Sequence, residues 1–308
     1  MKISVAMATY NGEKYIYEQI KSIASQSIVP DELIICDDCS SDATIDIIKK
    51  CINEFKNLCI SYSINDVNVG YAQNFFRALS KASGDYIFLA DQDDIWARKK
   101  VEVMMNIVRK NPDITCLSCK NIIVDGSGNV IKKEKSEKSM LTQISFRDVI
   151  EQKRLRPGMS LLITKGLKDE VLIKNIDTLE QHDRFIEAIA TLYGKFELVD
   201  EYLNKYRIHN NNTSGLNLTH KPIDGLQGRI RQTQKEIRYL KILQDVDVLN
   251  SEQMQCVYDE KQYFILRSEL LQNNNIAKYI LNLSKIIKRL SSPQILLGDI
   301  YCMVKSKN

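Results

Sequence analysis

The chain has 308 residues, of which 44% are hydrophobic and 27% are charged, and its formal net charge is +4. These values are typical of a globular protein with a full hydrophobic core, and they exclude a disordered, collagen-like or coiled-coil chain. The chain also lacks the excess of basic residues that is typical of a nucleic-acid-binding protein, so we expect no nucleic acid partner.

The eight cysteines and the first residues indicate where the protein works. Two cysteine pairs, Cys36-x-x-Cys39 and Cys116-x-x-Cys119, have the internal spacing of zinc ligands, but they lie much farther apart than the pairs of a zinc ribbon. We interpret them as reduced cysteines. The chain starts with a short apolar run and not a signal peptide, and no stretch is apolar over the roughly 18 residues of a membrane span. We therefore expect a cytoplasmic protein.

Short apolar runs alternate with helical periodicities over the first 125 residues. Strands are predicted at Ile3–Ala8, Leu33–Cys36, Leu58–Ile64 and Tyr86–Ala90, with amphipathic helices between them. This order is typical of a mostly parallel, twisted sheet flanked by helices, so the predicted fold class is α/β. In such open sheets, ligands bind at the carboxyl ends of the strands.

The following segment is less regular. A strand at Thr115–Val124 is expected to turn at Gly126–Asn129 into Val130-Ile131, and the charged segment 132–138 is predicted to be a mobile surface loop. Further elements are a buried strand at Ser160–Thr164, a helix at Asp183–Tyr193 and, beyond about residue 225, long helical stretches without a strand pattern.

Three carboxylates follow the apolar strand at Tyr86–Ala90 within four residues. Asp91, Asp93 and Asp94 repel one another unless a cation offsets their charge. Mg²⁺ and Mn²⁺ bind carboxylate oxygens and leave positions open for diphosphate oxygens, so the cluster predicts a site for one of these ions. The alternative is a solvated turn that caps the next helix, because aspartate is favoured at helix N-caps.

A second acidic pair, Asp37-Asp38, closes the second strand on the same edge of the sheet. Carboxylates there can accept hydrogen bonds from ribose hydroxyls or from a base N–H. The alternative is again a helix cap, but Ser40, Ser41 or Asp42 fits that position better. This leaves the pair available for a nucleotide.

The polar motifs after the strands form a set whose order and spacing match one known family. They are Ala8-Thr9-Tyr10-Asn11-Gly12, Asp37-Asp38-Cys39-Ser40, Asn68-x-Gly70, Gly84–Ala90 with Asp91-Gln92-Asp93-Asp94-x-Trp96, His182-Asp183, and Tyr206-Arg207-Ile208-His209. Over roughly residues 1–215 the chain resembles family 2 glycosyltransferases with the GT-A fold. The resemblance is closest to bacterial rhamnosyltransferase-like proteins that build surface polysaccharides such as capsules.

The resemblance implies roles for individual residues. Asp183 would be the catalytic base, and the metal ligands would be Asp93, Asp91 and His209. The residues on the nucleotide and substrate side would be Thr9, Tyr10, Asn11, Asp37, Asp38, Asp91, Gln92, Gly158 and Arg207. Without the resemblance, Asp183 is an ordinary helix N-cap, His209 a surface histidine, and Gly158 part of a turn before a strand. Trp96 stacks near the acceptor or packs under the acidic loop.

The chemistry of sugar transfer needs such groups. A carboxylate must take the proton of the acceptor hydroxyl, and the departing nucleoside diphosphate needs its charge neutralised. A single displacement inverts the anomeric carbon and needs no enzyme nucleophile. The predicted function is therefore an inverting hexosyl- or deoxyhexosyltransferase, with UDP-sugars and dTDP-rhamnose as candidate donors and a glycan or a lipid-linked acceptor. The alternatives are an inactive nucleotide-sugar-binding scaffold and, less well supported, a phosphoryl-transfer domain, for which a P-loop is missing.

We predict a catalytic domain at 1–215, with a nucleotide-binding half at 1–125 and an acceptor-side half at 126–215, and a helical region at 216–308. The segment 276–308 alternates apolar residues at helical spacing with six basic residues, against one acidic residue, Asp299. A basic amphipathic helix of this kind favours contact with the inner face of the cytoplasmic membrane. The alternative is packing on the catalytic domain or on a second copy of the chain, as in a homodimer.

Overall fold

A computed structural model describes residues 1–174, 179–209, 225–287 and 293–306. The chain forms two compact units, Met1–Ser145 with Arg156–Gly215, and Phe146–Leu155 with Leu216–Asn308. All the strands found in these described residues lie in the first unit. The short segment Phe146–Leu155, which we predicted in the acceptor-side half, belongs to the second unit, where its helix contacts α9 (Ser251–Gln272).

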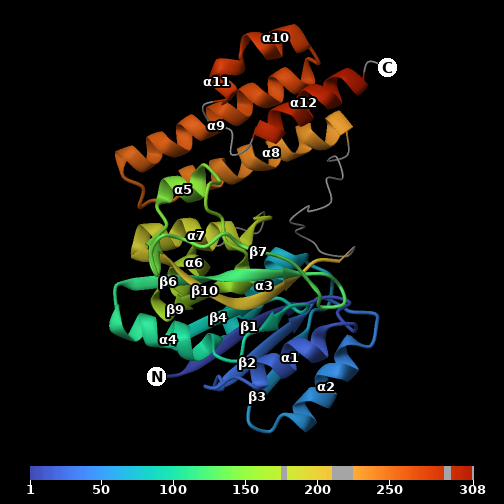
Figure 1. The fold of residues 1–308 in the computed structure, drawn as a ribbon, viewed down its shortest axis with the longest axis vertical. Helices are drawn as coiled ribbons and strands as arrows, with labels where there is room; N and C mark the ends of the chain where they lie inside the picture. The colour runs from blue at the N-terminus through green and yellow to red at the C-terminus, as the bar shows by residue number, and fades with distance from the viewer. Residues whose placement is uncertain (175–178, 210–224, 288–292, 307–308) are drawn as a thin grey trace. The chain divides into compact units, whose positions relative to one another are not determined.

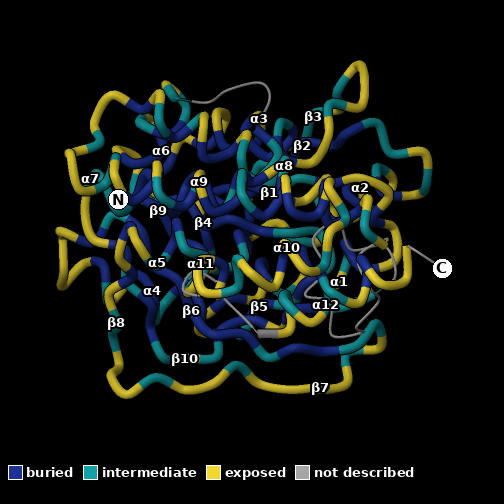
Figure 2. Tube along the Cα trace, turned by 90° about the horizontal axis from the view of Figure 1, so that it is seen from above, coloured by how far each residue is buried: buried dark blue, intermediate teal, exposed yellow. Residues whose placement is uncertain are grey.

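The first unit is built around one mixed sheet (Figure 1). Its strands are β1 (Ile3–Thr9), β2 (Glu32–Asp37), β3 (Cys59–Ile64), β4 (Tyr86–Ala90), β5 (Ile95–Trp96), β6 (Ile114–Val124), β7 (Val130–Lys133), β8 (Leu141–Gln143), β9 (Leu161–Thr164) and β10 (Lys195–Arg207). Their order is β3-β2-β1-β4-β9-β6-β10-β5, with β7 beside β6 and β8 beside β10. The central strands are apolar along their length because helices cover both faces of the sheet. Figure 2 shows β1 and β4 largely buried and β7 exposed.

The strand directions bring the predicted motifs to one edge of the sheet. Strands β1, β2, β3 and β4 are parallel to one another. Strand β9 is antiparallel to both β4 and β6, so β4 and β6 run the same way, and β10 is parallel to β6. The carboxyl ends of β1, β2, β4, β6 and β10 therefore share an edge, where ligands bind in folds of this kind.

Helices cover both faces of the sheet. They are α1 (Ile16–Ala24), α2 (Thr44–Glu54), α3 (Tyr71–Lys81), α4 (Lys100–Lys110), α6 (Lys165–Ile173) and α7 (His182–Tyr193), with a 3₁₀ turn, η1, at Gly158–Ser160. Helices α1, α2 and α4 share one apolar core with β1, to which α1 contributes Ile16, Ile20 and Ile23. Helix α3 packs on β1 and β2 and contacts α6 and α7. Figure 1 shows α1 and α2 on the opposite side of the sheet from α3.

The prediction of a mobile surface loop over 132–138 is wrong at its start. Lys132 and Lys133 belong to β7, which pairs with β6 after a hairpin turn. Glu134, the next residue, accepts hydrogen bonds from the backbone N and the side-chain Nδ2 of Asn121, at 3.2 and 2.9 Å. The charged sequence of this segment suggested full solvation. Instead, donors on β6 bind the carboxylates of Glu134 and Glu137.

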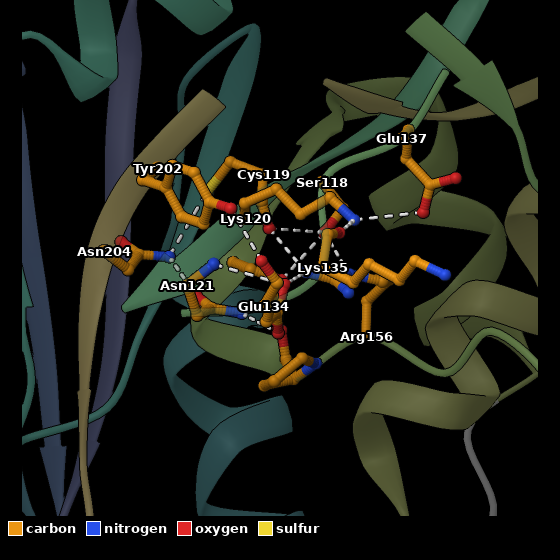
Figure 3. Close-up of polar contacts among 12 residues, drawn as sticks. Ser118, Cys119, Lys120, Asn121, Glu134, Lys135, Glu137, Arg156, Tyr202 and Asn204 are labelled. Carbon is orange, nitrogen blue, oxygen red and sulfur yellow. Dashed lines mark hydrogen bonds and ion pairs between the residues drawn. The ribbon is translucent and has the colours of Figure 1, made fainter. Parts of the chain in front are cut away.

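A buried polar network holds this segment in place (Figure 3). Arg156 forms an ion pair with Glu134 at 2.7 Å and donates to the backbone oxygen of Cys119 at 2.6 Å. Lys120, which is 3% exposed, pairs with Glu137 at 3.0 Å. Buried charges are stable only when they are paired and hydrogen bonded, so this network fixes the path of the chain from β7 to the turn at η1.

The described part of the second unit consists of helices and the turns between them. They are α5 (Phe146–Ile150), α8 (Gly225–Gln244), α9 (Ser251–Gln272), α10 (Ile276–Leu281), α11 (Leu283–Ile287) and α12 (Pro293–Lys305). Helices α8 and α9 form the most extensive contact between helices in this unit. A capping box in which the side chains of Asn250 and Gln253 each accept from the other's backbone N–H begins α9. Among the described residues, none of the helices is both long and apolar enough to cross a bilayer.

Asp299 on α12 is the polar centre of the second unit. Its carboxylate is fully buried and accepts hydrogen bonds from Arg229 on α8 (2.7 Å), Arg267 on α9 (2.8 Å) and Tyr279 on α10 (2.6 Å). Burial raises the pKa of Asp299, but the hydrogen bonds and charge of Arg267 outweigh burial and hold the pKa below its ordinary value. One carboxylate thus joins four helices.

Replacing Asp299 by alanine is expected to destabilise this unit by about 3–5 kcal/mol, because two arginines would keep their buried charge without a partner. Urea unfolding followed by circular dichroism measures the loss, and Asp247→Asn in the exposed turn between α8 and α9 is the matched control. An unchanged free energy of unfolding in Asp299→Ala would show that the cluster does not hold these helices together.

Candidate functional site

The first part of the site lies where β1 and β2 end. Thr9 donates from its hydroxyl to Asp37 at 2.8 Å, and Asp37 also accepts from the backbone N of Ser40 at 2.8 Å. Asn11 accepts from the backbone N of Ser41 at 2.8 Å. Asp37 is fully buried and Thr9 is 2% exposed. Both buried side chains therefore support the loop after β2 from the interior of the fold.

Asp38 connects this loop to the start of α3. One carboxylate oxygen accepts from the backbone N of Val69 and from Asn65 Nδ2, and the other accepts from the backbone N of Gly70, all at 2.8–2.9 Å. Gly70 has a φ of 85°, a conformation that favours glycine. The Asn68-x-Gly70 motif is thus explained by a backbone turn that Asp38 holds.

Gln92 connects the loop after β4 to the loop after β1. Its side chain accepts from the backbone N of Tyr10 and donates to the backbone oxygen of Tyr10, both at 2.9 Å. A Cβ on Gly12 would lie 2.3 Å from Gln92 Oε1, so a larger residue there would displace the side chain of Gln92 from these two hydrogen bonds. The ring of Tyr10 is 50% exposed and is free of the core, at the edge where the sheet ends.

The acidic cluster is present as predicted, with Asp91, Asp93 and Asp94 offering ligand oxygens within 4.8 Å of one another. Burial, followed by the charges of Asp93 and Asp183, raises the pKa of Asp91 to about 7. Burial, followed by the charges of Asp93 and Asp91, raises the pKa of Asp94 well above its ordinary value, and its buried Oδ2 lacks a hydrogen-bond partner within the described structure. Crowded carboxylates with an open oxygen fit a hard divalent cation.

His209 is beside this cluster. Its Nε2 lies 2.8 Å from Asp93 Oδ2, and its ring is 4.8 Å from that of Tyr15, centroid to centroid. The structure therefore brings His209 to the carboxylates from the far end of β10. Mn²⁺ accepts both carboxylate and imidazole ligands, so the donors around the cluster fit one of the two predicted ions.

Arg207 supports the cluster from behind and is 2% exposed. Its backbone N donates to Asp94 Oδ1 at 2.9 Å, and its Nε donates to the backbone oxygen of Asp93 at 2.8 Å. The guanidinium also donates to Glu18 at 2.5 Å and lies over the ring of Tyr15. The hydrogen bonds of Arg207 thus orient the acidic loop. Contact between Arg207 and a diphosphate stays a prediction.

Asp183 and Gly158 face the same place from α7 and η1. A Cβ on Gly158 would lie 3.4 Å from Asp183 Cβ, and the charge of Asp183 contributes to the raised pKa of Asp91. Asp183 accepts from the backbone N of Arg184 at 2.8 Å and is half-buried. Next to it, His182 stacks on Phe75 at 4.2 Å, which fixes the first turn of α7 against α3.

Two buried charged residues beside the site had no signal in the sequence. Lys100 donates to the backbone oxygen of Met159 at 2.7 Å and lies 3.8 Å over the ring of Trp96; burial lowers its pKa to about 8. Trp96 is 3% exposed and packs in the apolar core, with its ring 5.5 Å from that of Phe88, which favours the packing interpretation. Glu187, one turn after Asp183, accepts from the backbone N of Arg156 at 2.6 Å. Lysine and glutamate are rarely buried, so the sequence positions of Lys100 and Glu187 do not predict their burial.

The chain is similar to known proteins over most of its first unit. The model of glycosyl transferase family 2 matches residues 4–165. A glycosyltransferase of Methanocaldococcus jannaschii is 35% identical over 68% of this chain and 71% of its own length. The dTDP-rhamnosyl transferase RfbG of Shigella flexneri is 31% identical over 70% of this chain and 75% of its own length. The crystal structure of S. aureus TarS 1-349 in complex with UDP matches with a TM-score of 0.61 and 20% identity, covering 85% of this chain and 71% of that one.

Proposed function

The chain belongs to glycosyltransferase family 2, and we propose that it transfers a sugar from a nucleoside diphosphate donor to an acceptor hydroxyl with inversion at the anomeric carbon. The observation that carries the proposal is the convergence of Asp91, Asp93, His209 and Asp183 at one edge of the sheet. Direct displacement of the nucleoside diphosphate by the acceptor needs one carboxylate as the base and a second group of residues that neutralises the leaving group. The chain provides these groups from three separate segments, which are the loop after β4, the residues after β10 and the first turn of α7.

The base in this proposal is Asp183. It lies in the first turn of α7, where its half-buried carboxylate would receive the proton of the acceptor hydroxyl. The absence of a side chain on Gly158 lets η1 pack closely against His182 and Asp183, and the aromatic contact of His182 fixes the position of the base. The buried acid Glu187 orients the chain at Arg156, which leads into the η1 turn.

The residues that would hold Mg²⁺ or Mn²⁺ are Asp91, Asp93 and His209. When bound, the ion would neutralise charge on the departing diphosphate. Asp94 keeps the loop folded through its bond to the backbone of Arg207. The raised pKa of Asp91 means that part of the cluster is protonated near neutral pH, so cation binding should displace protons.

The nucleotide would lie between the loops after β1 and β2. The exposed ring of Tyr10 is positioned to stack on a base, and Thr9, Asn11, Asp37, Asp38 and Gln92 would bind it or hold the loops that do. TarS, a relative in fold, has been crystallised with UDP and the relative RfbG is a dTDP-rhamnosyl transferase, so UDP-sugars and dTDP-rhamnose are the proposed donors. By the same reasoning the acceptor is a glycan or a lipid-linked glycan in surface polysaccharide synthesis.

A donor panel tests the proposal against an inactive scaffold. We expect release of nucleoside diphosphate from at least one of UDP-glucose, UDP-GlcNAc or dTDP-rhamnose when Mg²⁺ or Mn²⁺ is present, and a loss of this release on adding EDTA. Slow hydrolysis of the donor makes the assay independent of the acceptor. Donor binding without turnover under every condition, measured by calorimetry in parallel, would favour the scaffold.

A further inference from the structure

Helices α10, α11 and α12 expose an unusual number of apolar side chains. Of eighteen exposed large hydrophobic residues in the described chain, six are on these three short helices. They are Ile280, Leu281, Ile287, Leu297, Tyr301 and Val304, and Leu281 and Leu297 are 83% and 67% exposed. Single exposed apolar residues are ordinary on a protein surface, but a concentration of this kind indicates a binding surface.

These side chains are not part of an unfinished core. Tyr279 and Ile286 are fully buried and fill the inner side of α10 and α11. On α12 the buried residues are Asp299, Cys302 and Met303, whereas Leu297, Tyr301 and Val304 recur at the spacing of the opposite face. Our sequence analysis expected a basic amphipathic helix within 276–308. The described part of this segment forms three helices, and the first two, which meet at Asn282, expose Ile280 and Ile287.

The charge on the same helices is of one sign. Lys278, Lys285 and Lys305 are exposed, and the sequence from 276 to 308 contains one acidic residue. That residue, Asp299, is fully buried between Arg229 and Arg267 and adds no negative charge to the surface. The exposed charges on the described parts of these helices are therefore all positive. Lys288, Arg289 and Lys307 lie outside the described residues.

We propose that α10, α11 and α12 are a docking surface for a membrane rich in anionic phospholipids. The apolar side chains would enter the boundary between headgroups and acyl chains, and the lysines would contact headgroup phosphates. A second copy of the chain fits less well, because a two-fold contact would bring identical positive faces together. The inference concerns the second unit and does not depend on the proposed function, although it would hold such an enzyme near a lipid-linked acceptor.

Vesicle flotation of the full chain tests the proposal, with neutral phosphatidylcholine vesicles compared with vesicles containing 30% phosphatidylglycerol. We expect binding to the anionic vesicles that weakens in 0.5 M salt. Each cation near such a surface strengthens binding about fivefold. The triple variant Lys278→Gln, Lys285→Gln, Lys305→Gln should therefore bind on the order of 100-fold more weakly, and Leu281→Ser with Leu297→Ser at least about tenfold more weakly.

Matched controls carry the same chemical changes elsewhere. Lys49→Gln, Lys50→Gln and Lys56→Gln remove three exposed cations from the first unit, and Ile173→Ser removes an exposed apolar residue of α6. Both controls should float like the unchanged chain. All substituted side chains are exposed, so circular dichroism should show each variant folded.

Three results would overturn the proposal. They are a failure of the unchanged chain to bind anionic vesicles at low salt, equal binding to neutral vesicles, and equal losses in the controls. A drop in sedimentation mass for the Leu281 and Leu297 variant, without vesicle binding by the unchanged chain, would assign the surface to a second copy. Turnover of a soluble donor without vesicles should be the same in all variants, so failure of the catalytic proposal would be seen separately.

Discussion

Replacing Asp93 by alanine is expected to abolish metal-dependent donor turnover and to leave the fold intact. Asp93 lies beyond the end of β4, is half-buried, and contacts His209 and not the apolar core. Loss of a ligand that helps to neutralise the leaving group removes several kcal/mol of transition-state stabilisation, a factor of about 10³ or more in rate. Donor hydrolysis in Mg²⁺ and Mn²⁺ measures the effect.

The same variant makes a second, separable prediction. The carboxylates repel one another in the absence of a cation, and Asp93 is among the charges that raise the pKa of Asp91. The Tm of the metal-free variant should therefore be no lower than that of the unchanged chain, and added Mn²⁺ should raise it less. Asp113→Asn, an exposed aspartate before β6, is the control for removal of a charge. Full activity of Asp93→Ala in EDTA would remove the metal from the mechanism.

Replacing Asp183 by asparagine is expected to keep donor affinity and to slow transfer by a factor on the order of 10²–10⁴, the usual contribution of a general base. Asparagine can still accept the hydrogen bond from the backbone N of Arg184, so α7 should begin normally. Calorimetric titration with the donor and single-turnover transfer to an acceptor separate the two effects.

The control for this change is Asp169→Asn, an exposed aspartate on the neighbouring helix α6, which should transfer at the normal rate. Loss of donor binding in Asp183→Asn would make Asp183 a binding residue and leave the reaction without its proposed base. Recovery of transfer in Asp183→Glu, even in part, would support the base, because glutamate keeps the carboxylate on a longer side chain.

The parallel core of the fold is predictable from sequence because its strands are buried on both faces. The predicted strands over Ile3–Ala8, Leu33–Cys36 and Tyr86–Ala90 match β1, β2 and β4 within a residue or two. The GT-A type fold, with helices following the sheet toward the carboxyl end, is confirmed. Strand β10 is harder to recognise in the sequence, because charged residues and irregular pairing near Val199 hide its alternation.

The site was predictable to the extent that its residues follow strands. Asp91 and Asp93 follow a wholly apolar strand, and a polar cluster at that point has few structural explanations. Lys100 and Glu187 gave no such signal, since what buries them is contact with residues far away in the sequence. The path of Phe146–Leu155 into the second unit was missed for the same reason.

The bond between His209 and Asp93 joins residues 116 positions apart. The acidic loop emerges from the ribosome long before β10, the strand that brings Arg207 and His209 to it. Until that strand is inserted between β6 and β5, the carboxylates have neither their guanidinium support nor their imidazole neighbour. Contacts between residues so far apart in the sequence slow folding. The candidate site is therefore assembled late in the folding of each new chain. A nascent chain halted before residue 195 should therefore be unable to bind the cation.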